Sequence, residues 1–245
     1  MKNYIIGIAG KRNAGKDTVA SMINYIFNVG VSKATYNEYV VKKNYYDINN
    51  DRIIHFADII KDILSNIYSI PRKYFDDRKY KDDLWYCINS NTFIPENSRY
   101  TDKDIFIVEI DTLKSFNLNT IINTNKNKNV CIKLRTLMQY FGTNICRNNL
   151  DNDIWIKATM NKAVDIAETR KICIIPDVRF TNEAKAIQYN NSSLYGGVIK
   201  INISNCDIIE HESEIIDIDY NFEINNNGSL LQLFYKVLEI CQTLV

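Results

Sequence analysis

The sequence predicts an α/β fold in which helices flank a mostly parallel sheet, with a helical or irregular insertion. Short apolar runs alternate with stretches whose apolar residues recur at helical spacing, which is typical of a parallel sheet. A glycine-rich loop joins the first such run to the first such helix. At 245 residues, the chain is long enough for a single domain over 1–245 that carries an insertion.

The first part of the chain predicts two strands and two helices. Residues 4–9 are apolar and broken by glycines, as in a buried parallel strand. Over 16–27 the apolar residues form one helical stripe, and Gly30 ends that helix. A polar stretch follows, and then an apolar run at 52–57 leads into a second helix with apolar positions over 59–67.

The middle of the chain is less regular. Residues 71–130 end in the asparagine-rich run "NTNKNKN", and we interpret approximately 65–130 as a variable insertion with mobile loops. From residue 131 onward, the apolar residues again recur at spacings typical of helices and strands. The expected elements are a helix over 132–147, a helix from near Asp153, a strand over 172–175 that delivers Asp177, a helix over 181–188, a strand over 196–203, an edge strand over 220–224, and a last helix capped by Ser229.

Composition and charge limit the function classes. A composition of 46% hydrophobic and 24% charged residues is that of a globular protein. The net charge of +1 argues against a nucleic-acid partner, because such a partner requires a basic face. The N-terminal residues run directly into a short strand, so we expect no signal peptide and no membrane partner.

The cysteines indicate a reducing compartment. Six cysteines are scattered without a C-x-x-C pair, and the chain has two histidines, so a zinc site is not expected. We interpret the cysteines as reduced thiols and expect a cytoplasmic location. Asparagine and isoleucine are plentiful and proline is scarce, which suggests an AT-rich genome such as that of a virus or a parasite. For a viral protein the expected location is the host cytoplasm.

The segment "GIAGKRNAGKDTVA" has the spacing of a phosphate-binding P-loop and predicts a P-loop NTPase fold. Gly10, Gly15 and Lys16 match G-x-x-x-x-G-K, but Asp17 stands where a hydroxyl would bind magnesium. A carboxylate can hold magnesium directly or through water, and the alternative is a charge that only stabilises the helix start. We assign nucleotide binding to eight loop residues: Gly10, Lys11, Asn13, Ala14, Gly15, Lys16, Asp17 and Thr18.

Beyond the loop, several motifs resemble one family in order. The loop is similar to the G-K-D-T form found in viral and phage deoxynucleoside monophosphate kinases. Five further segments resemble that family's motifs: "HFADIIKD" at 55–62, "RTLMQYFGTNICR" at 135–147 with "DIWI" after it, "DVRFTNEA" at 177–184, "HESE" at 211–214 and "INNNGS" at 224–229. The resemblance implies transfer of the ATP γ-phosphate, with Mg²⁺, to a deoxynucleoside monophosphate. Pro176 departs from the family pattern and bears on how Asp177 is presented.

Four residues besides Lys16 are assigned to catalysis. Asp177 follows a strand at the edge where α/β ligand sites lie, and we expect it to be the second magnesium ligand with Asp17. The resemblance adds Arg179 and Glu183 to the catalytic centre. Arg135 is expected to grip the acceptor phosphate with its planar fork. The alternatives are a helix cap for Asp177 and a solvated surface carboxylate for Glu183.

The remaining assignments concern the acceptor substrate. The expected acceptor-binding residues are Lys61, Arg78, Gln139, Arg147 and Trp155, with Lys81 beside Arg78. Gln139 carries an amide that can hydrogen-bond to a base edge. The resemblance implies that Trp155 stacks on the acceptor nucleotide or shapes its pocket. Ordinary structural roles are the alternatives, namely a core position for Trp155, a surface ion pair for Arg147 and a solvated face for the rest.

Two other functions stay open at this stage. Animal phosphomevalonate kinases share "GKR-x-x-GKD" but lack the R-x-x-x-Q-x-x-G-T run, so a related small-molecule kinase is one alternative. A nucleotide-binding switch without an acceptor is another. The sequence does not decide between a monomer and a homodimer, and it assigns no role to His211 or Ser213.

Overall fold

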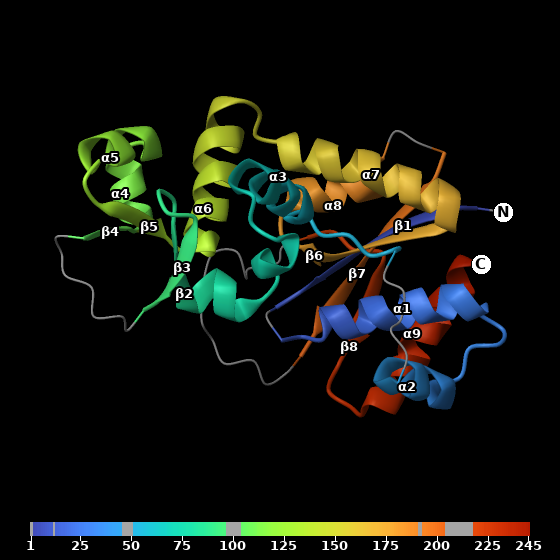
Figure 1. Cartoon of the computed structure of the whole chain (residues 1–245). Coiled ribbons are helices and arrows are strands. Elements are labelled where there is room, and N and C mark those ends of the chain that lie inside the picture. Colours follow the sequence, from blue (N-terminus) through green and yellow to red (C-terminus); the bar gives the residue numbers. More distant parts are fainter. Residues whose placement is uncertain (1, 12, 46–50, 97–103, 191–192, 204–217) are drawn as a thin grey trace. The chain divides into compact units, whose positions relative to one another are not determined.

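The structure is a computed structural model of the 245-residue chain. It describes residues 2–11, 13–45, 51–96, 104–190, 193–203 and 218–245. The chain divides into two compact units, which are described separately (Figure 1). The first unit comprises Met1–Phe56 and Ile156–Val245, and the second comprises Ala57–Trp155.

The first unit contains a four-stranded sheet in the order β6-β1-β7-β8, in which every neighbouring pair is parallel. Its elements are β1 (Tyr4–Gly10), α1 (Lys16–Val29), α2 (Tyr36–Tyr45), α7 (Ile154–Arg170, which begins in the second unit), β6 (Ile172–Val178), α8 (Thr181–Gln188), β7 (Tyr195–Asn202), β8 (Phe222–Asn225) and α9 (Leu230–Leu244).

Helices cover both faces of this sheet. Alternate residues of β1 point to opposite sides, so Ile6 and Ile8 pack in one apolar cluster and Ile5 and Ala9 in another. The first cluster includes residues of α1 and α9, and the second includes residues of α7 and α8. Figure 1 shows α1 and α9 on one side of the sheet and α7 and α8 on the other. The parallel arrangement places the carboxyl ends of β1 and β6 at the same edge.

The predicted α/β class and most of its elements are confirmed. The structure has β1, α1 with Gly30 as its C-cap, β6, α8, β7 and the edge strand β8 close to their expected bounds, and also α3 (Asp58–Tyr68) in the second unit. Ser229 caps α9, because its side chain accepts a hydrogen bond from the backbone N–H of Gln232. Two details differ, since α2 lies in the polar stretch and the 52–57 run makes one isolated bridge, from Ile53 to Ile174. Among the described residues, no helix is long and apolar enough to cross a membrane.

The second unit contains strands that the sequence analysis did not predict. Its elements are α3 (Asp58–Tyr68), the 3-10 helix η1 (Arg72–Phe75), the π-helix η2 (Lys79–Asp83), β2 (Leu84–Cys87), β3 (Thr92–Pro95), β4 (Ile105–Val108), α4 (Ile110–Ser115), α5 (Leu118–Thr124), β5 (Asn129–Ile132), α6 (Leu134–Gln139) and the π-helix η3 (Tyr140–Arg147).

These strands form a second sheet in the order β3-β2-β5-β4. β2 is antiparallel to β3 and β5, whereas β4 and β5 are parallel. The sequence predicted no strand within 71–128, and the described part of this range contains β2, β3 and β4. The sheet packs its own apolar cluster, which contains Phe75, Tyr86 and Val130.

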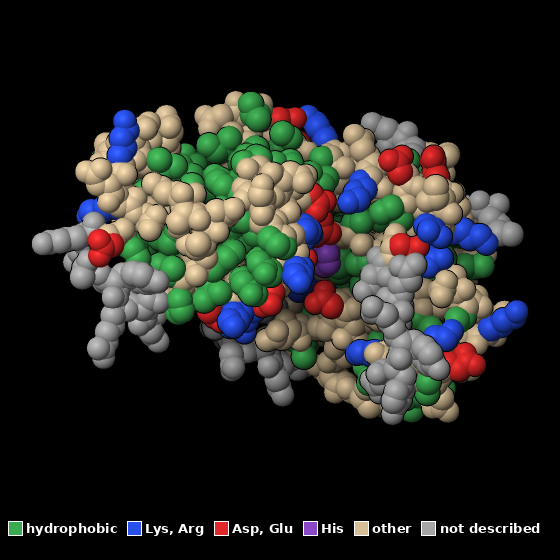
Figure 2. Space-filling view, viewed as in Figure 1, with side chains coloured by type: hydrophobic (Ala, Val, Ile, Leu, Met, Phe, Trp, Pro, Cys, Tyr) green, Lys and Arg blue, Asp and Glu red, His purple; other side chains and the backbone are tan. Residues whose placement is uncertain are grey.

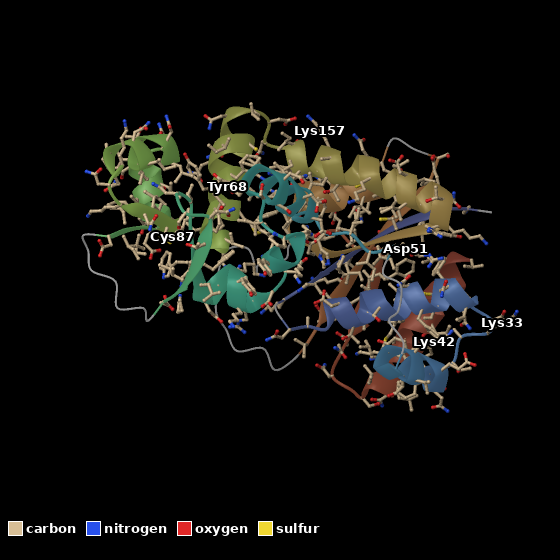
Figure 3. The ribbon with its side chains drawn as sticks, viewed as in Figure 1. Lys33, Lys42, Asp51, Tyr68, Cys87 and Lys157 are labelled. Atoms are coloured by element: carbon tan, nitrogen blue, oxygen red, sulfur yellow. A yellow bond between two sulfur atoms is a disulfide. The ribbon has the colours of Figure 1, made fainter. Side chains whose placement is uncertain are left out.

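A disulfide joins two strands of the second sheet. Cys87 on β2 and Cys131 on β5 lie directly opposite each other and are bonded, with an S–S distance of 2.02 Å (Figure 3). The expectation of reduced thiols is wrong for this pair, because it considered spacing along the chain and not cross-strand register. Cys146, Cys173 and Cys241 are buried free thiols, and burial raises the pKa of Cys173 and Cys241 to about 12. Cys206 lies outside the described residues.

Candidate active site

The glycine loop forms the turn between β1 and α1. Gly15 is the N-cap of α1 with φ 95°, and Asn13 also has a positive φ, of 62°. The Nζ atom of Lys16 donates hydrogen bonds to the carbonyl oxygens of Gly10 at 2.7 Å and Lys11 at 2.8 Å. The lysine ammonium is therefore held against the carbonyl groups at the beginning of the loop.

Steric contacts explain the glycine at the start of the loop. A Cβ atom on Gly10 would lie 2.9 Å from the carbonyl oxygen of Ile201, so the neighbouring strand excludes any side chain there. Ala14 is fully buried, whereas Asp17 is exposed and Thr18 half-buried on the first turn of α1. All eight predicted nucleotide-binding residues thus belong to one turn and the helix start that follows it. A carboxylate on the first turn is favoured by the helix dipole.

Asp177 lies next to this turn in the sheet, near the carboxyl end of β6. Gly7 pairs with Ile175 and Ala9 pairs with Val178, so β6 has one residue more than β1 between these pairs. Pro176 and Asp177 form this bulge, which suits proline because it has no N–H to donate.

The partners of Asp177 come from the segment before α3. Its Oδ1 atom lies 3.4 Å from the backbone N–H of Phe56, and its Oδ2 atom lies 3.7 Å from Nδ1 of His55. The side chain of Asp177 is 22% exposed. The carboxylate is therefore held on one side and remains accessible to a ligand.

Arg179 and Glu183 are connected through the backbone. Glu183 is buried, and its Oε2 atom accepts hydrogen bonds from the N–H groups of Arg179 at 2.8 Å and Phe180 at 3.1 Å. These bonds satisfy donors at the start of α8. The predicted alternative of a solvated surface carboxylate is wrong for Glu183, while Arg179 itself is exposed.

In the second unit, four cationic side chains lie around the carboxylates of Asp76 and Asp82. Arg135 donates two hydrogen bonds to Asp82, from Nε at 2.6 Å and from Nη2 at 2.9 Å. These bonds lower the pKa of Asp82, and the charges of Lys81 and Arg78 act in the same direction. Burial and the nearby charge of Arg135 lower the pKa of Lys81, and Lys61 contributes as well. Lys61, Arg78, Lys81 and Arg135 therefore form one cluster, which we call the cationic cluster.

Lys61 also belongs to a ring of alternating charges. Its Nζ atom contacts Asp58 at 3.1 Å and Asp76 at 2.8 Å. Arg72 contacts the same two carboxylates, at 2.9 Å for Asp58, and also Asp62 at 2.6 Å. Burial opposes the ionisation of Asp76, but Lys61 and Arg72 outweigh it and lower the pKa of that carboxyl.

The other predicted acceptor residues lie on the helices after β5. Gln139 is exposed and lies four residues after Arg135, so the two share one face of α6. Arg147 is half-buried at the end of η3. Trp155 is 3% exposed, and its indole N–H donates a 2.9 Å hydrogen bond to the carbonyl of Gly142, as in the predicted core alternative.

An apolar groove of about 430 Å³ lies elsewhere in the second unit. Figure 2 shows hydrophobic side chains gathered over this unit. The groove is lined by Leu64, Ile67, Tyr68, Asn117, Leu118, Asn119, Leu137, Tyr140, Phe141 and Ile145. None of these side chains is charged, so the groove offers no counter-ion for a phosphate, in contrast to the cationic cluster.

Sequence reasoning missed several of these residues. Asp58, Asp76 and Asp82 pair with predicted cations, and Arg72 pairs with Asp58 and Asp76. Asp58 lies in "HFADIIKD", and the other three lie in the densely charged run "PRKYFDDRKYKDD". That run predicted a charged region but not the pairing. His211 and Ser213 lie outside the described residues.

Comparison with known protein families decides the class of protein. The family model for deoxynucleotide monophosphate kinases matches residues 4–237. The chain belongs to the deoxynucleotide monophosphate kinase family. This kinase is therefore a phosphotransferase that phosphorylates deoxynucleoside monophosphates, on a fold compatible with that of P-loop NTPases. No curated protein matches the kinase in sequence.

Proposed function

We propose that the kinase transfers the γ-phosphate of ATP, with Mg²⁺, to a deoxynucleoside monophosphate bound by the cationic cluster. The observation that carries this proposal is the loop from Gly10 to Lys16, which has P-loop spacing between a buried strand and a helix. Loop N–H groups bind the donor phosphates, and Lys16 exchanges its two carbonyl contacts for phosphate oxygens.

The carboxylates of Asp17 and Asp177 suit a magnesium ion. Mg²⁺ is usually held by one or two protein carboxylates together with phosphate oxygens and water. Among the described residues, no group of three or more His, Cys, Asp or Glu side chains is arranged to hold a metal, so Asp17 and Asp177 are proposed from their places at the start of α1 and near the carboxyl end of β6. When bound, the ion neutralises charge on the donor phosphates.

The cationic cluster supports acceptor binding. A monophosphate is a dianion near neutral pH, and Arg135, Lys61, Arg78 and Lys81 supply positive charge in one place. Arg135 grips two phosphate oxygens, and Gln139 on the same helix face contacts the base. Trp155 shapes the pocket by fixing Gly142, and Arg147 contributes charge near the end of η3.

Phosphoryl transfer depends mainly on charge neutralisation and positioning. In this proposal Arg179 of the first unit stabilises negative charge on the donor phosphates, and Arg135 of the second unit stabilises negative charge on the acceptor phosphate. Glu183 acts through Arg179, because its carboxylate fixes the backbone N–H of that residue.

The finer assignments of partners and compartment are also part of the proposal. The net charge of +1 supports a small-molecule substrate and no nucleic-acid partner. We retain a cytoplasmic location, although the Cys87–Cys131 disulfide is of a kind that is rare in reducing compartments. A homodimer is the oligomeric state to test, by light scattering of the purified kinase.

One assay tests the proposed reaction. The kinase is incubated with Mg²⁺, ATP and each of the four deoxynucleoside monophosphates, and the products are separated. We expect ADP and the deoxynucleoside diphosphate in equal amounts. ATP binding without acceptor phosphorylation would favour a nucleotide switch, and phosphorylation of mevalonate phosphate alone would favour the related small-molecule kinase.

A further inference from the structure

The segment Ile224–Ser229 has no role in the reaction described above, yet one of its side chains reaches the glycine loop. Asn226 follows β8 directly, and its backbone N–H donates a 2.8 Å hydrogen bond to the carbonyl of Asn202 at the end of β7. Its side-chain Nδ2 atom donates a 2.9 Å hydrogen bond to the carbonyl oxygen of Ala14. The sheet thus anchors Asn226, and Asn226 holds a loop residue that is 212 positions away in sequence.

The same amide packs against the next residue of the loop. A Cβ atom on Gly15 would lie 2.8 Å from Nδ2 of Asn226, and Gly15 has a φ of 95°. Both the conformation and the contact therefore favour glycine at this position. Without the contact, the conformational freedom of Gly15 would leave the orientation of the peptide group between Ala14 and Gly15 less well defined.

We infer that Asn226 is a positioning residue for donor binding, which rests on the proposed role of the loop. In a planar trans peptide, the C=O and N–H groups point in opposite directions. Because Asn226 holds the carbonyl of Ala14 on one side, the N–H of Gly15 in the same peptide points away from Asn226. This orients one of the loop N–H groups that bind the donor phosphates. Asn226 acts through this peptide and does not itself touch the reacting atoms.

A second asparagine provides a matched control. Asn221 lies just before β8, and its side-chain Oδ1 atom accepts a 2.9 Å hydrogen bond from the N–H of Val198. Its own N–H donates a 2.9 Å hydrogen bond to the carbonyl of Val198. Asn221 thus ties β8 to β7 as Asn226 does, but its described contacts do not include the loop.

The experiment measures the affinity of the full-length kinase for ATP by calorimetry, and the KM values for ATP and for the monophosphate. For Asn226→Ala we expect ATP affinity to fall about three- to tenfold, the usual range for one lost hydrogen bond, with the KM for the monophosphate unchanged. Asn226→Asp keeps the size but lacks the N–H donor and adds negative charge near the phosphates. We therefore expect a larger loss for Asp than for Ala, whereas a space-filling role predicts the reverse.

The controls separate this inference from the proposed function. Asn221→Ala should lower thermal stability without changing ATP affinity. If wild-type ATP binding depends on Lys16 but both Asn226 variants bind ATP as wild type does, the inference is wrong and the proposed function stands. If Lys16→Met binds ATP as tightly as wild type, the proposed role of the loop fails, and this inference fails with it. If Asn226→Ala does not fold, the isosteric Asp variant alone decides, and wild-type affinity in it overturns the inference.

Discussion

Asp82 holds the guanidinium of Arg135 through two parallel hydrogen bonds, one from Nε at 2.6 Å and one from Nη2 at 2.9 Å. The two residues are 53 positions apart, on η2 and on α6. A paired arrangement of this kind fixes the plane of the arginine fork. Arg135 is thus pre-oriented within the cationic cluster, although more than half of its side chain is exposed.

The first prediction concerns the fork of Arg135. In Arg135→Lys the charge remains but the two-point grip is lost, so we expect kcat/KM for the monophosphate to fall about 10- to 100-fold. The KM for ATP should not change. Steady-state kinetics with each substrate varied in turn measures both values.

Arg170 is a matched control for this substitution. Its side chain is 54% exposed and pairs with Asp51, which closely resembles the 55% exposure of Arg135 and its pairing with Asp82. Arg170→Lys should leave both KM values unchanged. Equal effects of the two substitutions would show that Arg135 has no special role in acceptor binding.

The second prediction concerns the charge ring around Lys61. Arg72 neutralises Asp58 and Asp76, and both carboxylates also contact Lys61. In Arg72→Gln, Lys61 is the remaining one of these two cations beside the two carboxylates. More of its positive charge is then neutralised by Asp58 and Asp76, and less is available to a bound phosphate. We expect the KM for the monophosphate to rise about three- to tenfold, on the scale of a hydrogen bond to a charged group, with little change in the KM for ATP.

The exposed ion pair of Lys114 with Asp111 is the control for Arg72. Lys114→Gln removes a cation from the same unit but not from the ring, and exposed pairs contribute little. It should leave the kinetics unchanged. If Arg72→Gln also leaves the KM for the monophosphate unchanged, the ring does not support acceptor binding.

The third prediction is a pH dependence. Burial and the charge of Arg135 lower the pKa of Lys81 below the ordinary lysine value of about 10.4. Lys81 is charged below its pKa, so the KM for the monophosphate should rise as the pH increases through this lowered pKa. In Lys81→Arg the charge persists, and the alkaline rise should move to higher pH. A pH profile of KM that is identical in the two proteins would contradict this role for Lys81.

The fourth prediction concerns the disulfide. Cys87 and Cys131 are separated by 44 positions, and closing a loop of that length stabilises a fold by about 4 kcal/mol in the chain-entropy model. The double serine variant should lose about this much free energy of unfolding under oxidising conditions. The two tryptophans of the chain, Trp85 and Trp155, are buried in the second unit, so their fluorescence in denaturant follows this unit.

Reducing conditions provide the control for the disulfide. With the thiols reduced, wild type and the double serine variant should unfold at similar denaturant concentrations. A difference that persists in excess dithiol would assign the stabilisation to side-chain packing of the cysteines instead.

The sequence predicted the first unit well because its signals are local. Gly10, Gly15 and Gly30 mark the loop and the helix end, and Ser229 with Gln232 marks the start of α9. The apolar strands β1 and β6 are continuous runs. Local patterns of this kind specify an element without knowledge of its partners.

The sheet of the second unit could not be predicted because its strand order depends on distant pairing. β2, β3, β4 and β5 each have four residues, too few to show a clear alternation. The bond between Cys87 and Cys131 depends on the register of two of these strands. For the same reason the sequence predicted cations at Lys61 and Arg135 but not the carboxylates that hold them.

The most direct test of the account is a magnesium titration of turnover in wild type, Asp177→Asn and the control Asp165→Asn, which lies on an exposed face of α7. If Asp17 and Asp177 hold the ion that accompanies the donor, Asp177→Asn should lower turnover at least about a hundredfold and require more Mg²⁺ for half-maximal rate, while the control matches wild type. An Asp177→Asn kinase that is folded and has the wild-type rate and magnesium requirement would contradict the central claim.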